Sequence, residues 1–205
     1  MSTSLPLEHP YWHVRALAES CRDEVQSFQF SYYEYVPQSL SDLRAPFTLS
    51  SSELLDASRI ADIIAATPGG KELAIHSAVS MRDGTEMHIP MVDMATGSLA
   101  QLEKLRPFLG ESLFLAFKWF RSGRAFHGYA ATLVSNRKWA SLMGTLLLAN
   151  QKGLSPTVDP RWIGHRLIAG YSALRWTRNT VHYIEVPRAV DSGSRRNTQE
   201  PHTAA

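Results

Sequence analysis

A short polar turn between two apolar, aromatic segments is the feature that most constrains how this chain can fold. Residues 122–127 read Ser-Gly-Arg-Ala-Phe-His, and they separate the apolar runs 112–120 and 128–134. Two β-prone runs joined by a glycine-containing turn are typical of a β-hairpin. The pattern therefore predicts a pair of antiparallel strands with a small, cationic turn between them.

The residues of this turn are suited to holding a phosphate. Gly123 lets the backbone come close to an anion, while Ser122 and nearby backbone N–H groups can donate hydrogen bonds. Arg124 offers a bidentate guanidinium, and His127 on the second strand can supply a further donor. The turn indicates a nucleotide or nucleic-acid site without specifying a reaction.

Helical and strand patterns surround the hairpin. Capping residues at 50–53 and at Asp159-Pro160 mark two helix starts, and an Asp83-Gly84 turn joins two strands. We expect helices starting at residue 11 and over 53–66, 98–109, 136–149 and 160–168, and strands over 28–36, 73–80, 87–94, 113–134 (two strands), 173–177 and 182–186. This order predicts an α+β fold with a mostly antiparallel sheet flanked by helices. We expect one domain over 1–190 and a disordered tail over 191–205, which lacks apolar spacing.

Composition narrows the class of protein. The 205 residues are 44% apolar, which is ordinary for a globular protein. No run of about 18 apolar residues is present, so no transmembrane helix is expected. The first ten residues have no hydrophobic signal core, and the single cysteine, Cys21, rules out an internal disulfide and a cysteine-rich zinc module. Together these features predict a cytoplasmic protein.

The net charge of +2 hides an uneven distribution. The stretch 118–188 contains eleven Lys and Arg residues, but only Asp159 and Glu185 as acidic ones. A basic half of this kind is compatible with a phosphate-rich partner. A solvated basic face with no ligand explains the same charge equally well.

Two further segments place acidic and basic residues before and after the hairpin. The segment 88–94 reads His-Ile-Pro-Met-Val-Asp-Met and carries Asp93 near the end of a predicted strand. The segment 158–167 carries Asp159, and Arg175 follows on a later strand. Each of these residues also has a structural interpretation: Asp93 can end a strand, Asp159 can cap a helix and Arg175 can lie at a strand edge.

In this order the three segments resemble the catalytic core of archaeo-eukaryotic primases and primase-polymerases. In that family an acidic strand, a serine–x–histidine-type turn, a later acidic residue and a basic strand follow one another. The resemblance covers 73–178 and is closest to compact prokaryotic primase-like proteins. It implies an RRM-like core, phosphoryl transfer with Mg²⁺ or Mn²⁺, and nucleoside triphosphates and DNA or RNA as partners.

The resemblance also assigns roles to individual residues. Asp93 and Asp159 would hold the metal and, with His127, take part in catalysis. The nucleotide would be bound by Ser122, Gly123, Arg124, His127 and Arg175.

The chain departs from the family at its acidic strand. The family's strand carries two carboxylates two residues apart, which share one face of the strand. In this chain the positions two residues before and after Asp93 are Met91 and Ala95, so a single carboxylate remains. We therefore expect binding of nucleotide and nucleic acid with weak or absent autonomous nucleotidyl transfer. Two alternatives stay open. One is an active primase-polymerase, and the other is an interaction scaffold with protein partners in a mobile-element or defence complex.

Overall fold

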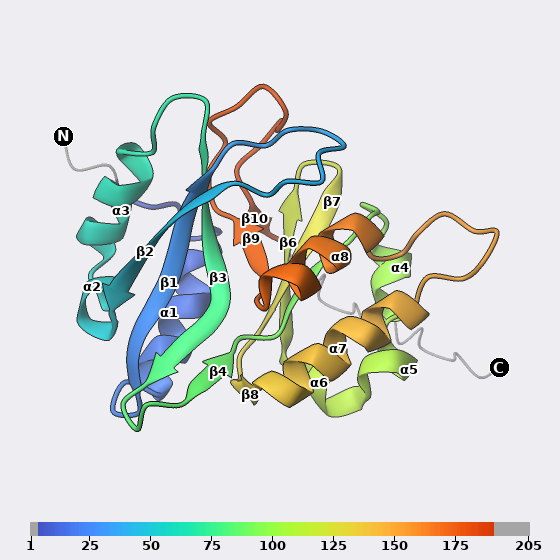
Figure 1. Ribbon diagram of the computed structural model, residues 1–205, viewed down its shortest axis with the longest axis horizontal. Coiled ribbons are helices and arrows are strands. Elements are labelled where there is room, and N and C mark those ends of the chain that lie inside the picture. The colour runs from blue at the N-terminus through green and yellow to red at the C-terminus, as the bar shows by residue number, and fades with distance from the viewer. Residues whose placement is uncertain (1–3, 191–205) are drawn as a thin grey trace, which may run out of the picture.

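Antiparallel sheets form the centre of the structure, a computed structural model that describes residues 4–190 (Figure 1). The first sheet runs in spatial order β2 (Arg44–Ser50), β1 (Val25–Tyr33), β3 (Glu72–Met81), β4 (Glu86–His88) and β8 (Val134–Ser135), and β9 (Ala173–Arg175) also pairs with β3. The second runs β10 (Arg188–Ala189), β6 (Phe117–Ser122), β7 (Ala125–Ala130) and β5 (Met91–Asp93). The predicted tail, 191–205, lies outside the described residues.

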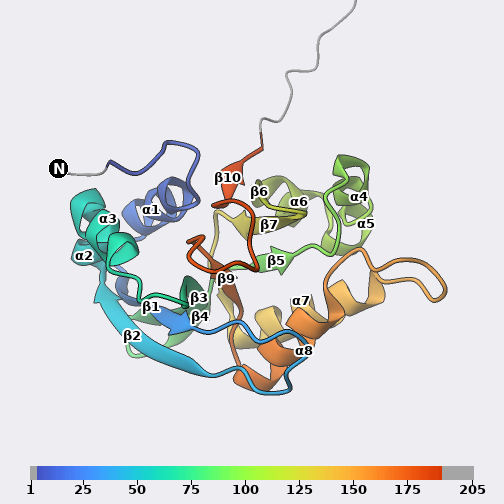
Figure 2. The ribbon, with the colours of Figure 1, turned by 90° about the horizontal axis from the view of Figure 1, so that it is seen from above.

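Helices cover both sheets, which confirms the predicted α+β class. The helices that pack against the first sheet are α1 (Tyr11–Ser20), α2 (Ser51–Leu55) and α3 (Ala57–Ala65). Those that share an apolar cluster with the second sheet are α4 (Leu99–Glu103), α5 (Arg106–Leu109), α6 (Glu111–Ala116), α7 (Asn136–Leu148) and α8 (Pro160–Ala169), and α7 also contacts β4 and β8 of the first sheet. Seen from above, α1–α3 lie on one side of the molecule and α4–α6 on the other (Figure 2). Two large apolar clusters result, and the one beneath the first sheet also takes in Met91, Phe120 and Tyr129 from the second sheet.

The predicted hairpins form, with one important change. β3 and β4 pair around the Asp83-Gly84 turn, and β6 and β7 pair around Gly123, whose φ is 80°. The predicted strand 87–94 is divided, because the Ile89-Pro90 step carries the chain from β4 in the first sheet to β5 in the second. Proline has no N–H to donate to a sheet ladder, so a strand is easily interrupted there.

Several predicted boundaries were wrong for local reasons. The helix over 53–66 is broken at Asp56, whose carboxylate accepts the N–H groups of Ser58 and Arg59 and starts α3. The helix over 98–109 is divided into α4 and α5, with a proline in the first turn of α5. Residues 113–116, predicted as strand, belong to α6, because short apolar runs carry no reliable period.

The end of the chain differs most from the prediction. Residues 182–186, predicted as a strand, form a loop, and the edge of the second sheet is taken by β10 instead. In this loop the backbone oxygen of Glu185 accepts a hydrogen bond from the Arg175 side chain rather than from a neighbouring strand. Upstream, α8 begins at Pro160 and is capped by Asp159, as predicted.

No helix in the described residues is both long enough and apolar enough to cross a bilayer.

Candidate functional site

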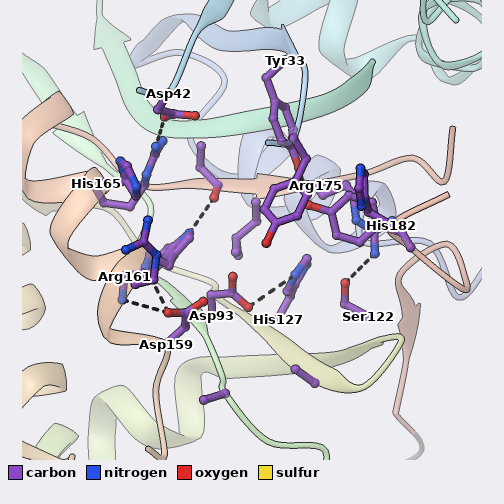
Figure 3. Close-up of a pocket in the computed structure, with 18 of the residues that line it drawn as sticks. Tyr33, Asp42, Asp93, Ser122, His127, Asp159, Arg161, His165, Arg175 and His182 are labelled. Carbon is purple, nitrogen blue, oxygen red and sulfur yellow. Dashed lines mark hydrogen bonds and ion pairs between the residues drawn. The ribbon is translucent and has the colours of Figure 1, made fainter. Parts of the chain in front are cut away.

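A cavity of about 710 Å³ opens where the two sheets meet, which is an ordinary volume for a small-molecule site. Its walls come from the end of β1 and the loop after it, the end of β5, the β6–β7 turn, the first half of α8, and β9 with the loop that follows (Figure 3). Every residue that the sequence singled out for the site lines this cavity: Asp93, Ser122, Gly123, Arg124, His127, Asp159 and Arg175.

The two carboxylates are brought together by the backbone. Met94 and Val158 form an isolated β-bridge, and the Asp159 N–H donates to the Asp93 carbonyl oxygen at 2.9 Å. The Asp159 carboxylate is already in use, because it accepts the N–H groups of Arg161 at 2.8 Å and Trp162 at 3.2 Å. Asp159 therefore combines its predicted capping role with a place at the cavity wall.

The environment of Asp93 disfavours the ionised form of its carboxyl group. Burial first, and the nearby Asp159 carboxylate second, raise its pKa from 3.8 to about 8, although Arg175 and Arg166 act in the opposite direction. About a quarter of its side chain remains exposed. A positively charged ligand at this point would be electrostatically favoured.

His127 lies directly opposite Asp93 in the β5–β7 register. Its Nε2 is 3.6 Å from Asp93 Oδ1, and its Nδ1 is buried without a hydrogen-bond partner in the described residues. Burial, and to a lesser extent Arg175, hold the pKa of this imidazole well below its usual value. His127 is thus neutral near pH 7, with one ring nitrogen that can donate and one that can accept.

The hairpin turn holds a carboxylate rather than standing open. The Gly123 N–H donates to Glu185 Oε1 at 3.1 Å, and Ser122 Oγ accepts from Arg175 Nη2 at 2.8 Å. Ser122 pairs across the hairpin with Ala125, the residue two positions before His127. Ala125 itself has no hydroxyl group, and the serine of the hairpin, Ser122, lies opposite it. Arg124 is exposed at the tip of the turn.

Arg175 is the central cation of this end of the cavity. Its side chain is buried on β9, and its guanidinium donates to Ser122 Oγ and to the backbone oxygens of Thr177 and Glu185. It also lies 3.9 Å from the centre of the Tyr183 ring, within cation–π distance. Its predicted role in phosphate binding would require part of this network to rearrange.

Sequence reasoning missed the opposite end of the cavity. There the loop after β1 contributes Asp42, whose carboxylate pairs with Arg166 on α8 and with Arg44 at 2.8 Å. Arg161 and His165 line the same wall (Figure 3). The i,i+4 spacing of Arg161 and His165 after a clear helix start was a usable signal for a shared face. Nothing local linked this helix to Asp42, which lies 124 residues before Arg166.

The residues fit a single divalent ion shared with a ligand, and they do not form a closed metal cage. Among the described residues no group of three His, Cys, Asp or Glu side chains is arranged to hold a metal. Mg²⁺, however, is commonly held by one or two carboxylates together with substrate phosphates. Burial and the Asp159 carboxylate disfavour the ionised form of Asp93, and a cation bound beside it would favour that form.

A sequence model of the AEP-like archaeo-eukaryotic primase 1D-like family matches residues 51–188, well over half of the chain. The chain belongs to the archaeo-eukaryotic primase 1D-like family. The membership confirms the resemblance drawn from the acidic strand, the hairpin and the helix start at Asp159, which all lie inside the matched range. Among curated proteins and among solved structures, no significant match was found. In this primase-like protein three further residues that line the cavity, Tyr33, Asp42 and Arg44, lie before the matched range. Sequence reasoning had not assigned them to the site.

Proposed function

We propose that this primase-like protein binds a nucleoside triphosphate together with DNA or RNA, and that its autonomous nucleotidyl transfer is weak or absent. The observation that carries the proposal is the meeting, in one cavity, of the hairpin donors with the carboxylates of Asp93 and Asp159. Family membership favours nucleotide and nucleic acid as the ligands.

The hairpin end of the cavity would bind the phosphates. The Gly123 N–H and the Ser122 hydroxyl are short-range donors, while Arg124 and Arg175 bring positive charge to the same end. Charge-assisted hydrogen bonds to phosphate oxygens are stronger than neutral ones. The neutral His127 can donate one further hydrogen bond without adding charge.

Asp93 and Asp159 would hold Mg²⁺ or Mn²⁺ jointly with the phosphates. When bound, such an ion supplies charge neutralisation at the triphosphate and activation of an attacking hydroxyl. The acidic strand offers one carboxylate because Met91 and Ala95 flank Asp93, and an oxygen of Asp159 is engaged by the first turn of α8. Two ions would therefore be poorly held, which is the physical reason for expecting weak turnover.

Nucleotide binding is tested by calorimetric titration with ATP and Mg²⁺. We expect Arg124→Ala to weaken the affinity about tenfold, since it removes a charged contact. Arg137→Ala, an exposed cation on α7 outside the cavity, is the matched control and should leave the affinity unchanged. Equal binding by wild type and Arg124→Ala would argue against the hairpin as the phosphate site.

The second candidate is an active primase-polymerase, favoured by the position of His127 opposite Asp93 in the same cavity. Priming assays with Mn²⁺ separate the two functions. Product from the wild type that is lost in both Asp93→Ala and His127→Ala would support catalysis. Binding without product supports the proposal. Absence of any nucleotide binding would leave the fold as an interaction scaffold with protein partners.

A further inference from the structure

A loop that follows β9 lines the cavity beside the β6–β7 hairpin, at the end where the proposed function places the phosphates. We call residues 181–187, between β9 and β10, the strap. Three consecutive strap residues line the cavity, namely His182, Tyr183 and Ile184. In Figure 2 the segment from β9 to β10 lies between the two groups of helices, beside β5. Figure 3 labels His182 with Arg175 and Ser122 among the residues that line the cavity, and the His182 ring contacts that of Tyr35.

The strap places the Glu185 carboxylate on the Gly123 N–H of the hairpin, and Arg188 Nε donates to its second oxygen, Oε2, at 3.2 Å. Glu185 Oε1 accepts the Gly123 N–H at 3.1 Å, and the Glu185 backbone oxygen accepts from Arg175 Nη1 at 3.2 Å. Ile184 closes the same turn, because a Cβ added to Gly123 would lie 3.1 Å from its Cγ1 atom. Two of the groups that the proposed function assigns to phosphate are thus already bonded to the strap.

The strap is fixed at both ends. Before it, the buried Glu72 carboxylate accepts the backbone N–H groups of Asn179 and Thr180, both at 2.8 Å. After it, β10 pairs with β6, and the Ala189 N–H donates to the Glu8 carbonyl oxygen at 2.7 Å. Movement between these anchors would not disturb the sheets.

The strap is unevenly packed. Val181 is 95% exposed and Ile184 is 58% exposed, whereas the Tyr183 ring lies on the Arg175 guanidinium, 3.9 Å from ring centre to Cζ, and contacts the Tyr35 ring. The Tyr183 hydroxyl lies 3.2 Å from that of Tyr33, which ties the strap to the end of β1. Segments with few buried apolar contacts open at low free-energy cost.

We propose that the strap is a built-in competitor of the phosphate ligand, and this rests on the proposed function of the hairpin. The Glu185 carboxylate occupies the place of a phosphate oxygen, and a nucleoside triphosphate binds by displacing it. The carboxylate and a phosphate oxygen are both anions that accept the same Gly123 N–H, and the Glu185 backbone oxygen uses a guanidinium N–H of Arg175 that a phosphate would also accept. They cannot share the site, because two negative charges at hydrogen-bond distance repel each other.

The test compares Glu185→Ala and Glu185→Gln with a charge-matched control. Glu24→Gln removes the same charge from an exposed position outside the cavity. In calorimetric titrations with ATP and Mg²⁺, Glu185→Ala should lower Kd about tenfold, because one competing charged contact is lost. Glu185→Gln keeps an oxygen acceptor and should give a smaller gain, and Glu24→Gln should bind as the wild type does.

Hydrogen exchange provides a second measurement on the unmodified protein. Saturating ATP should increase amide exchange in the strap and decrease it in the hairpin. An affinity for ATP that is unchanged or weaker in Glu185→Ala would contradict the proposal that the strap competes with phosphate. Greater protection of the strap with ATP bound would contradict it as well. Either result would leave the proposed function in place. If neither the wild type nor Glu185→Ala binds ATP, the proposed function itself fails, because in the variant no Glu185 carboxylate occupies the Gly123 N–H.

Discussion

At the scale of single residues, Asp93 shows how the site is held at a cost to stability. Its carboxylate is partly buried beside Asp159, and the nearest cations do not fully offset the loss of water. Groups that are needed for binding are often kept in environments that disfavour their charged form. The folded protein therefore prefers Asp93 protonated over a pH range in which the unfolded chain ionises it.

Replacing Asp93 with asparagine should stabilise the protein in a pH-dependent way. The pKa is raised to about 8 from 3.8, so the stability that protonated Asp93 contributes is present below about pH 4 and is lost as the pH rises to about 8. Asp93→Asn should raise the free energy of unfolding by roughly 1–3 kcal/mol above pH 8, after allowance for solvent screening. Urea unfolding at pH 4.5 and 8.5 measures the difference. An equal effect at both pH values would contradict it.

Buried histidine gives the opposite dependence at acidic pH. His9 is 3% exposed, its Nδ1 accepts the Tyr11 N–H, and burial lowers its pKa to about 4 despite a hydrogen bond with the Trp176 carbonyl. A lowered pKa means that this stability is complete above about pH 6.5 and is lost as the pH falls toward 4. In His9→Gln the unfolding free energy should fall less steeply with decreasing pH over this range. The slope should be smaller by an amount that corresponds to at most one proton taken up on unfolding. An unchanged slope would show that His9 does not titrate on unfolding.

At the scale of elements, the residue that caps α8 also lies at the candidate site. Asp159 caps the helix and, at the same time, places its carboxylate beside Asp93. Pro160 follows at the first helical position, where its missing N–H is harmless. The start of α8 therefore determines where the second carboxylate of the cavity lies.

Two substitutions at Asp159 should separate its roles. Asp159→Ser keeps a capping oxygen but removes the charge, whereas Asp159→Ala removes both. We expect Asp159→Ala to lose about 1 kcal/mol of stability and Asp159→Ser to lose little. Both should weaken Mg²⁺-dependent ATP binding to a similar extent. Thermal unfolding and calorimetric titration measure the two effects. If Asp159→Ser binds ATP in the presence of Mg²⁺ as tightly as the wild type, Asp159 acts only as the cap of α8.

At the scale of the whole molecule, the cavity is closed by contacts between distant parts of the chain. The loop after β1 is tied to α8 by the pair of Asp42 and Arg166, and the Arg166 side chain is only 2% exposed. Arg44 contacts the same carboxylate from β2. This bridge joins the first sheet to the helices of the second.

Removing the Asp42 carboxylate should be strongly destabilising. Asp42→Ala leaves the Arg166 guanidinium buried without its partner, which costs roughly 3–5 kcal/mol in comparable pairs. Glu19→Ala removes a carboxylate from an exposed pair with Arg22 and should change stability by less than about 0.5 kcal/mol. Urea denaturation of both variants gives the comparison. Similar small losses would mean that the bridge does not hold the two halves together.

Local signals accounted for much of the fold. The capping box of Ser50 and Glu53, the Asp159-Pro160 helix start and the Gly123 turn each depend on neighbours within a few residues, and each forms as expected. Residues 113–116 and the strand over 87–94 were mistaken because short apolar runs fit either a helix or a strand.

The sequence by itself determined the chemistry of the hairpin, the two carboxylates and, through their order, the family. Tertiary structure alone decided what each group contacts. The Glu185 carboxylate accepts the N–H of Gly123, 62 residues earlier in the chain, and Asp42 pairs with Arg166, 124 residues later. Contacts at such separations leave no period or short motif in the chain, since they depend on how the sheets and loops pack around one cavity.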